Sequence, residues 1–219
     1  MLAGALPVLT AYADLLAGAG VERGLLGPRE APRLWDRHLL NCVGAAELLP
    51  QDAVVVDLGS GAGLPGVVLA AVRPDLQLVL LEPLLRRAVF LEEVVQALGL
   101  PNAVVRRGRA EELAGGRLAG PGVGADGLVD AVVARAVAPL DRLAGWALPL
   151  LRPGGRLLAL KGESAARELV DAGPALRAAG AVSSRVVEVG SAELLTAAVV
   201  VEVVAGEGPK RRRSKGGRR

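Results

Sequence analysis

The stretch 53-AVVVDLGSGAGLPG-66 carries the clearest structural signal in the chain. Its opening AVVVDL is a nearly continuous apolar run, which is typical of a strand buried on both faces of a sheet. A glycine-rich turn follows, and Pro65 then stands where a helix favours proline, at its first position. A buried strand that leads through glycines into a helix predicts a binding site where a ligand approaches the backbone closely.

The same alternation of strand and helix continues after this stretch. Apolar strand-like runs lie at residues 76–82, 103–107, 128–134 and 156–160. Helices are predicted at residues 65–72, 84–98, 139–151 and 164–179, with turns at 99–102 and 152–155 and a Gly/Ala-rich loop at 114–127. Such an order of elements indicates a parallel sheet with both faces covered.

Two last strand-like runs, 185-RVVEV-189 and 196-TAAVVVEVV-204, lie only a few residues apart. A connection this short allows only antiparallel pairing. We therefore predict a Rossmann-like α/β fold with a mostly parallel, seven-stranded sheet that ends in a C-terminal antiparallel hairpin. This architecture resembles that of the class I AdoMet-dependent methyltransferases, whereas a nicotinamide-binding domain would end on another parallel unit.

The 219 residues suit a single globular domain with a charged end. We divide the chain into an N-terminal helical cap at 1–50, a methyltransferase-like core at 51–205 and a disordered basic tail at 206–219. The tail carries a net charge of +6, and residues 1–205 carry −3. A basic tail attracts a polyanion such as RNA. A solvated tail without any role fits the pattern equally well.

Scarce residue types exclude several classes of site. With one histidine and one cysteine, the chain cannot build a disulfide framework or a zinc site of several imidazoles. We predict no metal site and no catalytic histidine, cysteine or serine. The apolar residues 194–205 are too short to span a bilayer, and residues 1–14 contain no basic residue that would mark a signal peptide. We expect a cytoplasmic protein without a membrane segment.

The glycine loop alone leaves its ligand open, because 61-GAGLPG-66 also matches the dinucleotide fingerprint G-x-G-x-x-G. Asp57 precedes the loop, where it would orient a cationic aminoacyl sulfonium, and Pro65 removes an N–H that a pyrophosphate would use. Both favour S-adenosylmethionine. Glu82 closes the second strand and is expected to bind the ribose hydroxyls. Ala110 and Glu111 follow the third strand, where they would contact adenine.

The chain resembles the RsmG (GidB) family over residues 33–165. The resemblance rests on 57-DLGSGAGLPG-66, 109-RAEEL-113, 132-VVARAVAPL-140 and 157-LLALKGES-164, in that order, with 80-LLEPLLRRAVFLEEV-94 and 35-WDRHLLN-41. It implies S-adenosylmethionine-dependent methylation of the position-seven nitrogen of a guanine in small-subunit (16S) ribosomal RNA. Together with the loop, it implies cofactor contacts from Gly59, Gly61, Leu64, Glu82, Ala110, Glu111 and Arg135.

The N-terminal region departs from the family pattern. Residues 18–30 read GAGVERGLLGPRE where the family has a Trp-Asn and Asn-Leu-Thr stretch, and Asn41 stands where an aspartate is common. These departures concern the surface toward the RNA. We predict RNA contacts from Arg33, Arg37, His38 and Lys161, with Arg135 and Lys161 as candidates that position the reactants.

The reaction asks for little acid–base chemistry, because the position-seven nitrogen of guanine has a lone pair and no proton. Alignment and desolvation of the two reactants would supply most of the catalysis. The expected partner is small-subunit ribosomal RNA or its assembly intermediate, bound by a monomer. Two alternatives stay open: a methyltransferase of another RNA or a small molecule, and a non-catalytic, ribosome-associated protein that binds a nucleotide.

Overall fold

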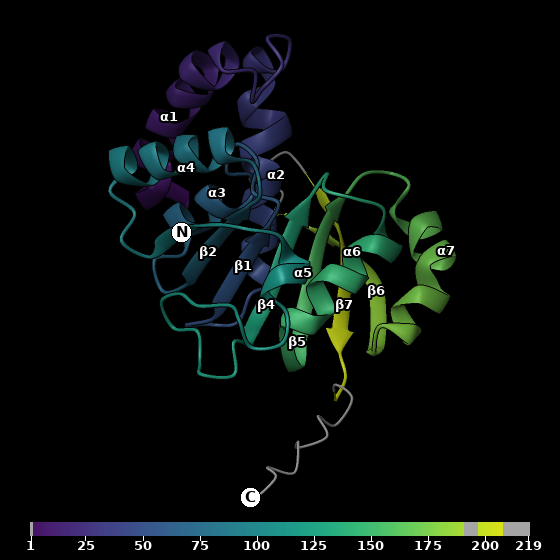
Figure 1. Ribbon diagram of the computed structural model, residues 1–219. Coiled ribbons are helices and arrows are strands. Elements are labelled where there is room, and N and C mark those ends of the chain that lie inside the picture. The colour runs from purple at the N-terminus through teal and green to yellow at the C-terminus, as the bar shows by residue number, and fades with distance from the viewer. Residues whose placement is uncertain (1, 191–196, 208–219) are drawn as a thin grey trace, which may run out of the picture.

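A computed structural model describes residues 2–190 and 197–207. One seven-stranded sheet forms its centre, with the strand order β3-β2-β1-β4-β5-β7-β6 (Figure 1). The strands are β1 (Val54–Leu58), β2 (Gln77–Glu82), β3 (Ala103–Arg107), β4 (Val129–Arg135), β5 (Leu151–Lys161), β6 (Ala181–Val189) and β7 (Ala198–Ala205). The first five are parallel, and β7 runs antiparallel to both β5 and β6. This confirms the predicted sheet and its hairpin.

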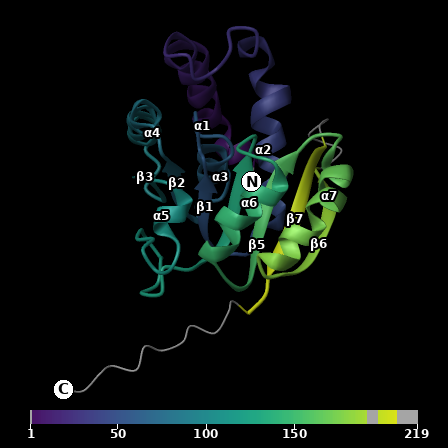
Figure 2. The same ribbon diagram turned by 45° about the vertical axis from the view of Figure 1, so that its right-hand side comes forward.

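Helices cover both faces of the sheet (Figure 1). Val55 packs with the first four α-helices on one face, and its neighbours Val54 and Val56 pack with the last three on the other, as the two-residue period of a strand requires. Figure 2 shows β3 and β6 at opposite edges of the sheet. The α-helices are α1 (Leu2–Leu15), α2 (Leu40–Ala45), α3 (Gly66–Val72), α4 (Leu85–Leu98), α5 (Ala110–Leu113), α6 (Leu140–Ala147) and α7 (Ala165–Ala178).

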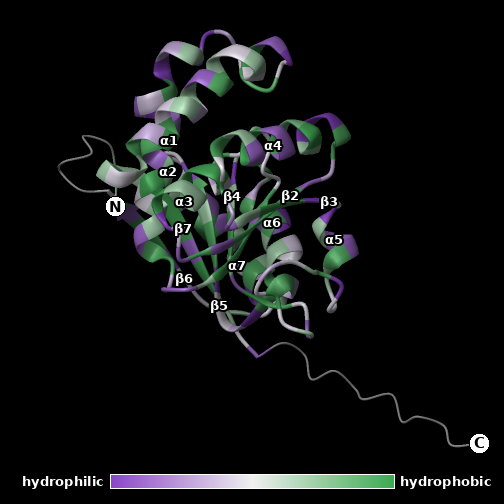
Figure 3. Ribbon diagram, turned by 90° about the vertical axis from the view of Figure 1, so that its left-hand side faces the viewer, coloured by the Kyte–Doolittle hydropathy of each residue, from purple (hydrophilic) through white to green (hydrophobic). Residues whose placement is uncertain are grey.

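The N-terminal cap shares a hydrophobic core with α3 and α4. Helix α1 continues as the π-helical turn η1 (Leu16–Gly20). By length and composition alone, residues Leu2–Gly20 are apolar enough to cross a membrane. In this fold Leu9, Tyr12 and Leu16 of that helix are fully buried against the protein interior. Hydrophobic residues likewise concentrate on the strands and on the helix faces turned toward them (Figure 3).

Three boundaries differ from the sequence prediction by more than two residues, and one is the start of β6, at Ala181 instead of residue 185. The predicted helix at 139–151 ends earlier, since α6 stops at Ala147 and a 3₁₀ turn, η5 (Leu148–Leu150), follows it. Strand β5 begins at Leu151 instead of residue 156, because Leu151 pairs with Val129 and a register shift absorbs the turn residues behind it. The basic tail predicted at 206–219 lies outside the described residues from 208 onward.

Candidate functional site

The glycine loop lies at the carboxyl end of β1 and leads into α3. Gly59, Gly61 and Gly63 all have positive φ, which L side chains rarely adopt. A Cβ atom at Gly63 would also lie 2.6 Å from Val67 Cγ2 and 2.7 Å from the Tyr12 hydroxyl. That hydroxyl donates a hydrogen bond of 2.8 Å to the Ala62 carbonyl. The N-terminal helix therefore supports the loop from behind.

Glu82 ends β2 beside this loop. Its carboxylate is 1% exposed and accepts hydrogen bonds of 2.9 Å from the N–H groups of Gly61 and Leu84. Each carboxylate oxygen has two lone pairs, so each can accept a further bond. The structure thus places Glu82 against the loop, and gives the side chain a task that the sequence did not show, which is to hold the loop and the start of α4.

Asp57 has a different environment from the one expected. The side chain is completely buried, and Oδ2 accepts a hydrogen bond of 2.9 Å from Gly66 N–H at the start of α3. Residue 57 faces the same side of β1 as Val55, under α3, and it lines neither of the cavities beside the loop. In this structure Asp57 shapes the loop, and its orientation of a bound sulfonium stays a prediction.

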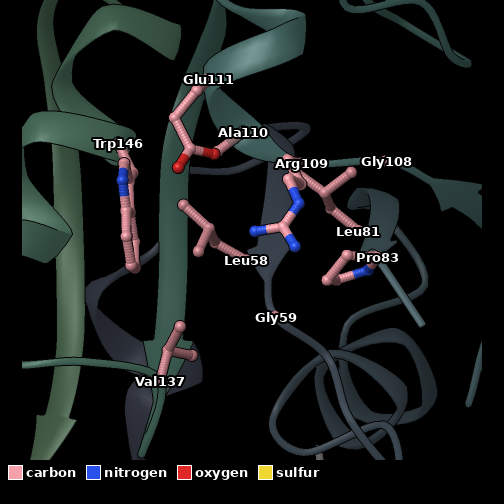
Figure 4. A pocket seen from close by; sticks show the side chains of 10 residues that line it. All are labelled: Leu58, Gly59, Leu81, Pro83, Gly108, Arg109, Ala110, Glu111, Val137 and Trp146. Atoms are coloured by element: carbon pink, nitrogen blue, oxygen red, sulfur yellow. The ribbon is translucent and has the colours of Figure 1, made fainter.

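A narrow, mostly apolar cavity of about 160 Å³ lies on the opposite face, and we call it the ring cavity (Figure 4). Three of the residues predicted to contact the cofactor line it, namely Gly59, Ala110 and Glu111. Trp146 of α6 forms one wall with Leu58, a contribution that sequence reasoning missed. Trp146 lies far along the chain from the glycine loop, so only the packing of α6 on the sheet brings the indole there.

A second cavity, of about 240 Å³, lies over the glycine loop, and we call it the loop cavity. Gly59 lines both this cavity and the ring cavity. Three more of the predicted cofactor residues line the loop cavity, namely Gly61, Leu64 and Arg135. Residues of the cap, the loop, α4 and the end of β4 complete its lining, namely Leu25, Leu26, His38, Ser60, Ala62, Arg87 and Ala136. All seven predicted contacts are thus gathered around one loop, Glu82 through its bond to Gly61.

A third cavity, of about 490 Å³, opens at the carboxyl ends of β4 and β5, and we call it the edge cavity. Arg37, Asn41 and Lys161 line it, and it shares Arg135 and Ala136 with the loop cavity. The three cavities therefore form one track along the carboxyl edge of the sheet. Ligands of open α/β sheets bind at this edge.

Ala136 stands where the loop and edge cavities meet. Its φ of 54° is left-handed, which is uncommon for a residue other than glycine. Such backbone strain persists where the surroundings over-determine it, and it concentrates at functional sites. No local pattern in 135-RAVAP-139 marked this position in advance.

The residues predicted to bind RNA divide into two groups. Arg37 and Lys161 line the edge cavity, but the Lys161 ammonium already contacts Glu168 Oε1 at 2.7 Å and the Ala138 carbonyl at 3.0 Å. His38 lines the loop cavity and lies between Glu30 and Arg135, and its side chain is only 12% exposed. Arg33 is exposed and lines none of the three cavities.

Comparison with known proteins matches the sequence of this chain to one family. The family model of GidB, rRNA small subunit methyltransferase G, matches residues 5–196. Two curated proteins named ribosomal RNA small subunit methyltransferase G are similar over most of their length. The protein from Streptomyces avermitilis is 56% identical over 90% of this chain and 79% of its own. The protein from Salinispora arenicola is 54% identical over 98% and 90%.

Among solved structures, the S-adenosylmethionine-dependent methyltransferase SibL in its apo form superposes with a TM-score of 0.59. It is 18% identical and covers 90% of this chain and 62% of its own, so it supports the fold alone. The sheet order, the antiparallel hairpin and the glycine loop agree with the class I methyltransferase fold. From the family match and the identities above 50%, the chain belongs to the GidB family of small-subunit rRNA methyltransferases.

Proposed function

We propose that the protein transfers a methyl group from S-adenosylmethionine to the position-seven nitrogen of a guanine in small-subunit (16S) ribosomal RNA. The observation that carries this proposal is the track of three cavities. The ring and loop cavities have Gly59 in common, and the loop and edge cavities have Arg135 and Ala136 in common. A donor and an acceptor can therefore approach each other at one point along the sheet edge.

The chemistry of the first two cavities supports this cofactor. The ring cavity offers Trp146 and Ala110 to adenine, with the Glu111 carboxylate beside them. Glu82 has acceptor capacity left for ribose hydroxyls. The loop cavity would hold the amino-acid part. When bound, S-adenosylmethionine supplies an activated methyl group.

The edge cavity would hold the RNA. Arg37, Arg135 and Lys161 outnumber the one acid of its lining, Glu163, and basic groups suit a phosphate or the polar edge of a base. The accepting nitrogen carries no proton, so the protein needs no general base. These side chains would bind and orient the nucleotide next to the methyl donor.

Calorimetry with purified protein tests the cofactor. We expect binding of S-adenosylmethionine in preference to NADH, and preference for NADH would overturn the proposal. Glu82→Gln should weaken S-adenosylmethionine binding by about tenfold or more, because it removes a charged acceptor at the ribose. Glu47→Gln, which changes an exposed carboxylate of the cap, is the matched control and should bind normally.

Mass analysis of ribosomal RNA tests the substrate. RNA from a deletion strain should lack one methylated guanine, and purified protein should restore it to isolated small subunits. An unchanged guanine would point instead to another RNA or a small molecule. We further propose a cytoplasmic monomer, which light scattering of the full chain with and without RNA would check.

A further inference from the structure

Three side chains form a hydrogen-bonded row from the cap to the end of β4. Glu30 Oε2 lies 2.8 Å from His38 Nε2, and His38 Nδ1 lies 2.7 Å from Arg135 Nη2. Arg135 is the last residue of β4 and lines both the loop cavity and the edge cavity. The row therefore ends on a cation at the junction of the two cavities.

The contacts determine where the imidazole carries its proton. A guanidinium group can only donate hydrogen bonds, so His38 Nδ1 must accept and is unprotonated. The neutral ring then carries its proton on Nε2 and donates it to the Glu30 carboxylate. A second proton, on Nδ1, would place an N–H group directly against the Arg135 N–H.

The other bonds of Arg135 all lead to the same short segment of the cap. Nη2 donates to the Arg37 carbonyl at 3.2 Å, and Nη1 donates to the His38 carbonyl at 3.3 Å and to Cys42 Sγ at 3.6 Å. The bond to His38 Nδ1 is the shortest of the four and the only one to an imidazole. It is also the only one of them that a change of pH near neutrality would break.

The surroundings of His38 oppose its protonation, and burial is the largest cause. Burial lowers the pKa of His38 below its ordinary value, and the charges of Arg135 and Arg37 act in the same direction against the pull of Glu30. On the side of Arg135, Tyr12 of α1 and Cys42 of α2 interact electrostatically with its guanidinium and with Asp57 of β1, and burial raises the pKa of all three side chains. The tyrosine and cysteine therefore stay neutral at neutral pH.

We propose that Glu30 and His38 are positioning residues that hold the Arg135 guanidinium at the junction of the loop and edge cavities. The working form of His38 is neutral, with its proton on Nε2. Protonation of His38 releases Arg135 and slows methyl transfer. The inference rests on the proposed function, because the junction matters to the reaction only where methyl donor and acceptor meet.

Nitrogen NMR of tag-free protein tests the tautomer without any activity measurement. His38 is the only histidine in the chain, so its two ring nitrogens give an unambiguous signal. At pH 7.5 we expect an unprotonated Nδ1 and a protonated Nε2, with a titration midpoint below about 6.5, the ordinary pKa. A proton on Nδ1 at pH 7.5 would overturn the proposal.

Two substitutions of His38 distinguish the role of Nδ1 from that of Nε2. In His38→Asn the amide oxygen can occupy the place of Nδ1 and still accept from Arg135, whereas in His38→Gln the amide lies near Nε2. We expect kcat/KM of His38→Asn at pH 8 to lie within about threefold of the wild-type value. The decrease in rate at acidic pH, which protonation of His38 causes in the wild type, should be absent from this variant. His38→Gln should lower kcat/KM by about tenfold or more, because a charged hydrogen bond is lost.

A second pair of variants tests Glu30. Glu30→Gln should move the decrease in rate at acidic pH to lower pH, because Glu30 raises the pKa of His38. Asp36→Asn, which changes an exposed carboxylate of the same segment, should not move it.

The outcomes distinguish this inference from the proposed function. Equal rates for His38→Asn and His38→Gln, or a decrease in rate at acidic pH that persists in His38→Asn, would overturn the positioning role. RNA affinity that rises as the pH falls, in the wild type but not in His38→Asn, would make His38 a direct RNA contact and also overturn it. A wild-type protein that methylates no small subunit would remove the proposed function, while the NMR result would still decide the tautomer.

Discussion

Asp57 shows how a single buried acid shapes the glycine loop. Burial raises the pKa of Asp57 from its ordinary range to about 7, against the hydrogen bonds from Ser60 and Gly66, which lower it. One of its oxygens, Oδ1, is buried without a hydrogen-bond partner among the described residues. In the folded protein Asp57 therefore keeps its proton up to about pH 7. In the unfolded chain it releases the proton at about pH 4.

This difference predicts a pH dependence of stability with a definite sign. Between about pH 4 and pH 7 the folded state binds one more proton at Asp57, so its free energy of unfolding falls as the pH rises. Between about pH 5 and pH 8 the wild type should lose on the order of 2 kcal/mol of its free energy of unfolding through Asp57. The Asp57→Asn variant should not show this loss. Urea titrations of both proteins at several pH values check this. Parallel pH profiles of the two would contradict it.

Cys42 offers a second test at the residue scale. Burial raises the pKa of the Cys42 thiol to about 11, with Arg135 as the opposing influence. Thiolate is the reactive form, so native protein at about pH 8 should react with Ellman's reagent at least about 100-fold more slowly than a free thiol. Because the chain has one cysteine, the urea-unfolded protein provides a control of stoichiometry. Rapid reaction of the native protein would show that the α2 region opens.

At the scale of elements, the start of α3 depends on a close approach to β1 and β2. A Cβ atom at Gly66 would collide with Leu80 Cδ2 and would lie 2.5 Å from Asp57 Oδ2. Glycine there lets the helix begin directly against the strands, so that its first N–H reaches the Asp57 carboxylate.

A pair of glycine substitutions in helices tests this packing. Gly66→Ala should lower the free energy of unfolding by about 1–3 kcal/mol, because it overfills the contact between helix and sheet. Gly145→Ala, at an exposed position of α6 with no heavy atom within 4 Å of the new Cβ, should raise it by about 0.5–1 kcal/mol. Urea unfolding of the two variants measures both effects. Similar values for the pair would contradict the packing argument.

At the scale of the whole molecule, charge separates the folded body from the end of the chain. Residues 1–205 carry a net charge of −3, and the chain as a whole carries +3. A basic segment on an acidic body would contribute to RNA affinity chiefly through phosphate contacts, which salt screens.

Removal of residues 208–219 tests that contribution. We expect the truncated protein to bind small subunits more weakly and with a flatter dependence on salt. The logarithmic slope should fall by about 0.7 for each phosphate that these residues neutralise in the full chain. S-adenosylmethionine affinity should not change. A Gly/Ser segment of the same length is the control for chain length, and an unaltered salt slope would show that these residues take no part in binding.

The sequence by itself determined the elements and the glycine loop. Continuous apolar runs, the glycines at 59–63 and the closeness of the last two strands are local patterns, and local backbone preference follows from them directly. The strand boundaries at 103–107 and the helix end at Gly99 agree with the structure for this reason. The positions of Gly59, Ala110 and Glu111 in one cavity also followed, because they lie just beyond the carboxyl ends of parallel strands in the same sheet.

Only the tertiary structure decided which side chains meet. Trp146 completes the ring cavity, Tyr12 supports the loop, and Lys161 pairs with Glu168. His38 and Arg135 are 97 positions apart in the chain, yet they share a contact that depends on the protonation of one ring nitrogen. Such contacts depend on the angle and distance at which whole helices pack on the sheet. No local pattern of residues specifies that geometry, because it is set by the packing of the whole core.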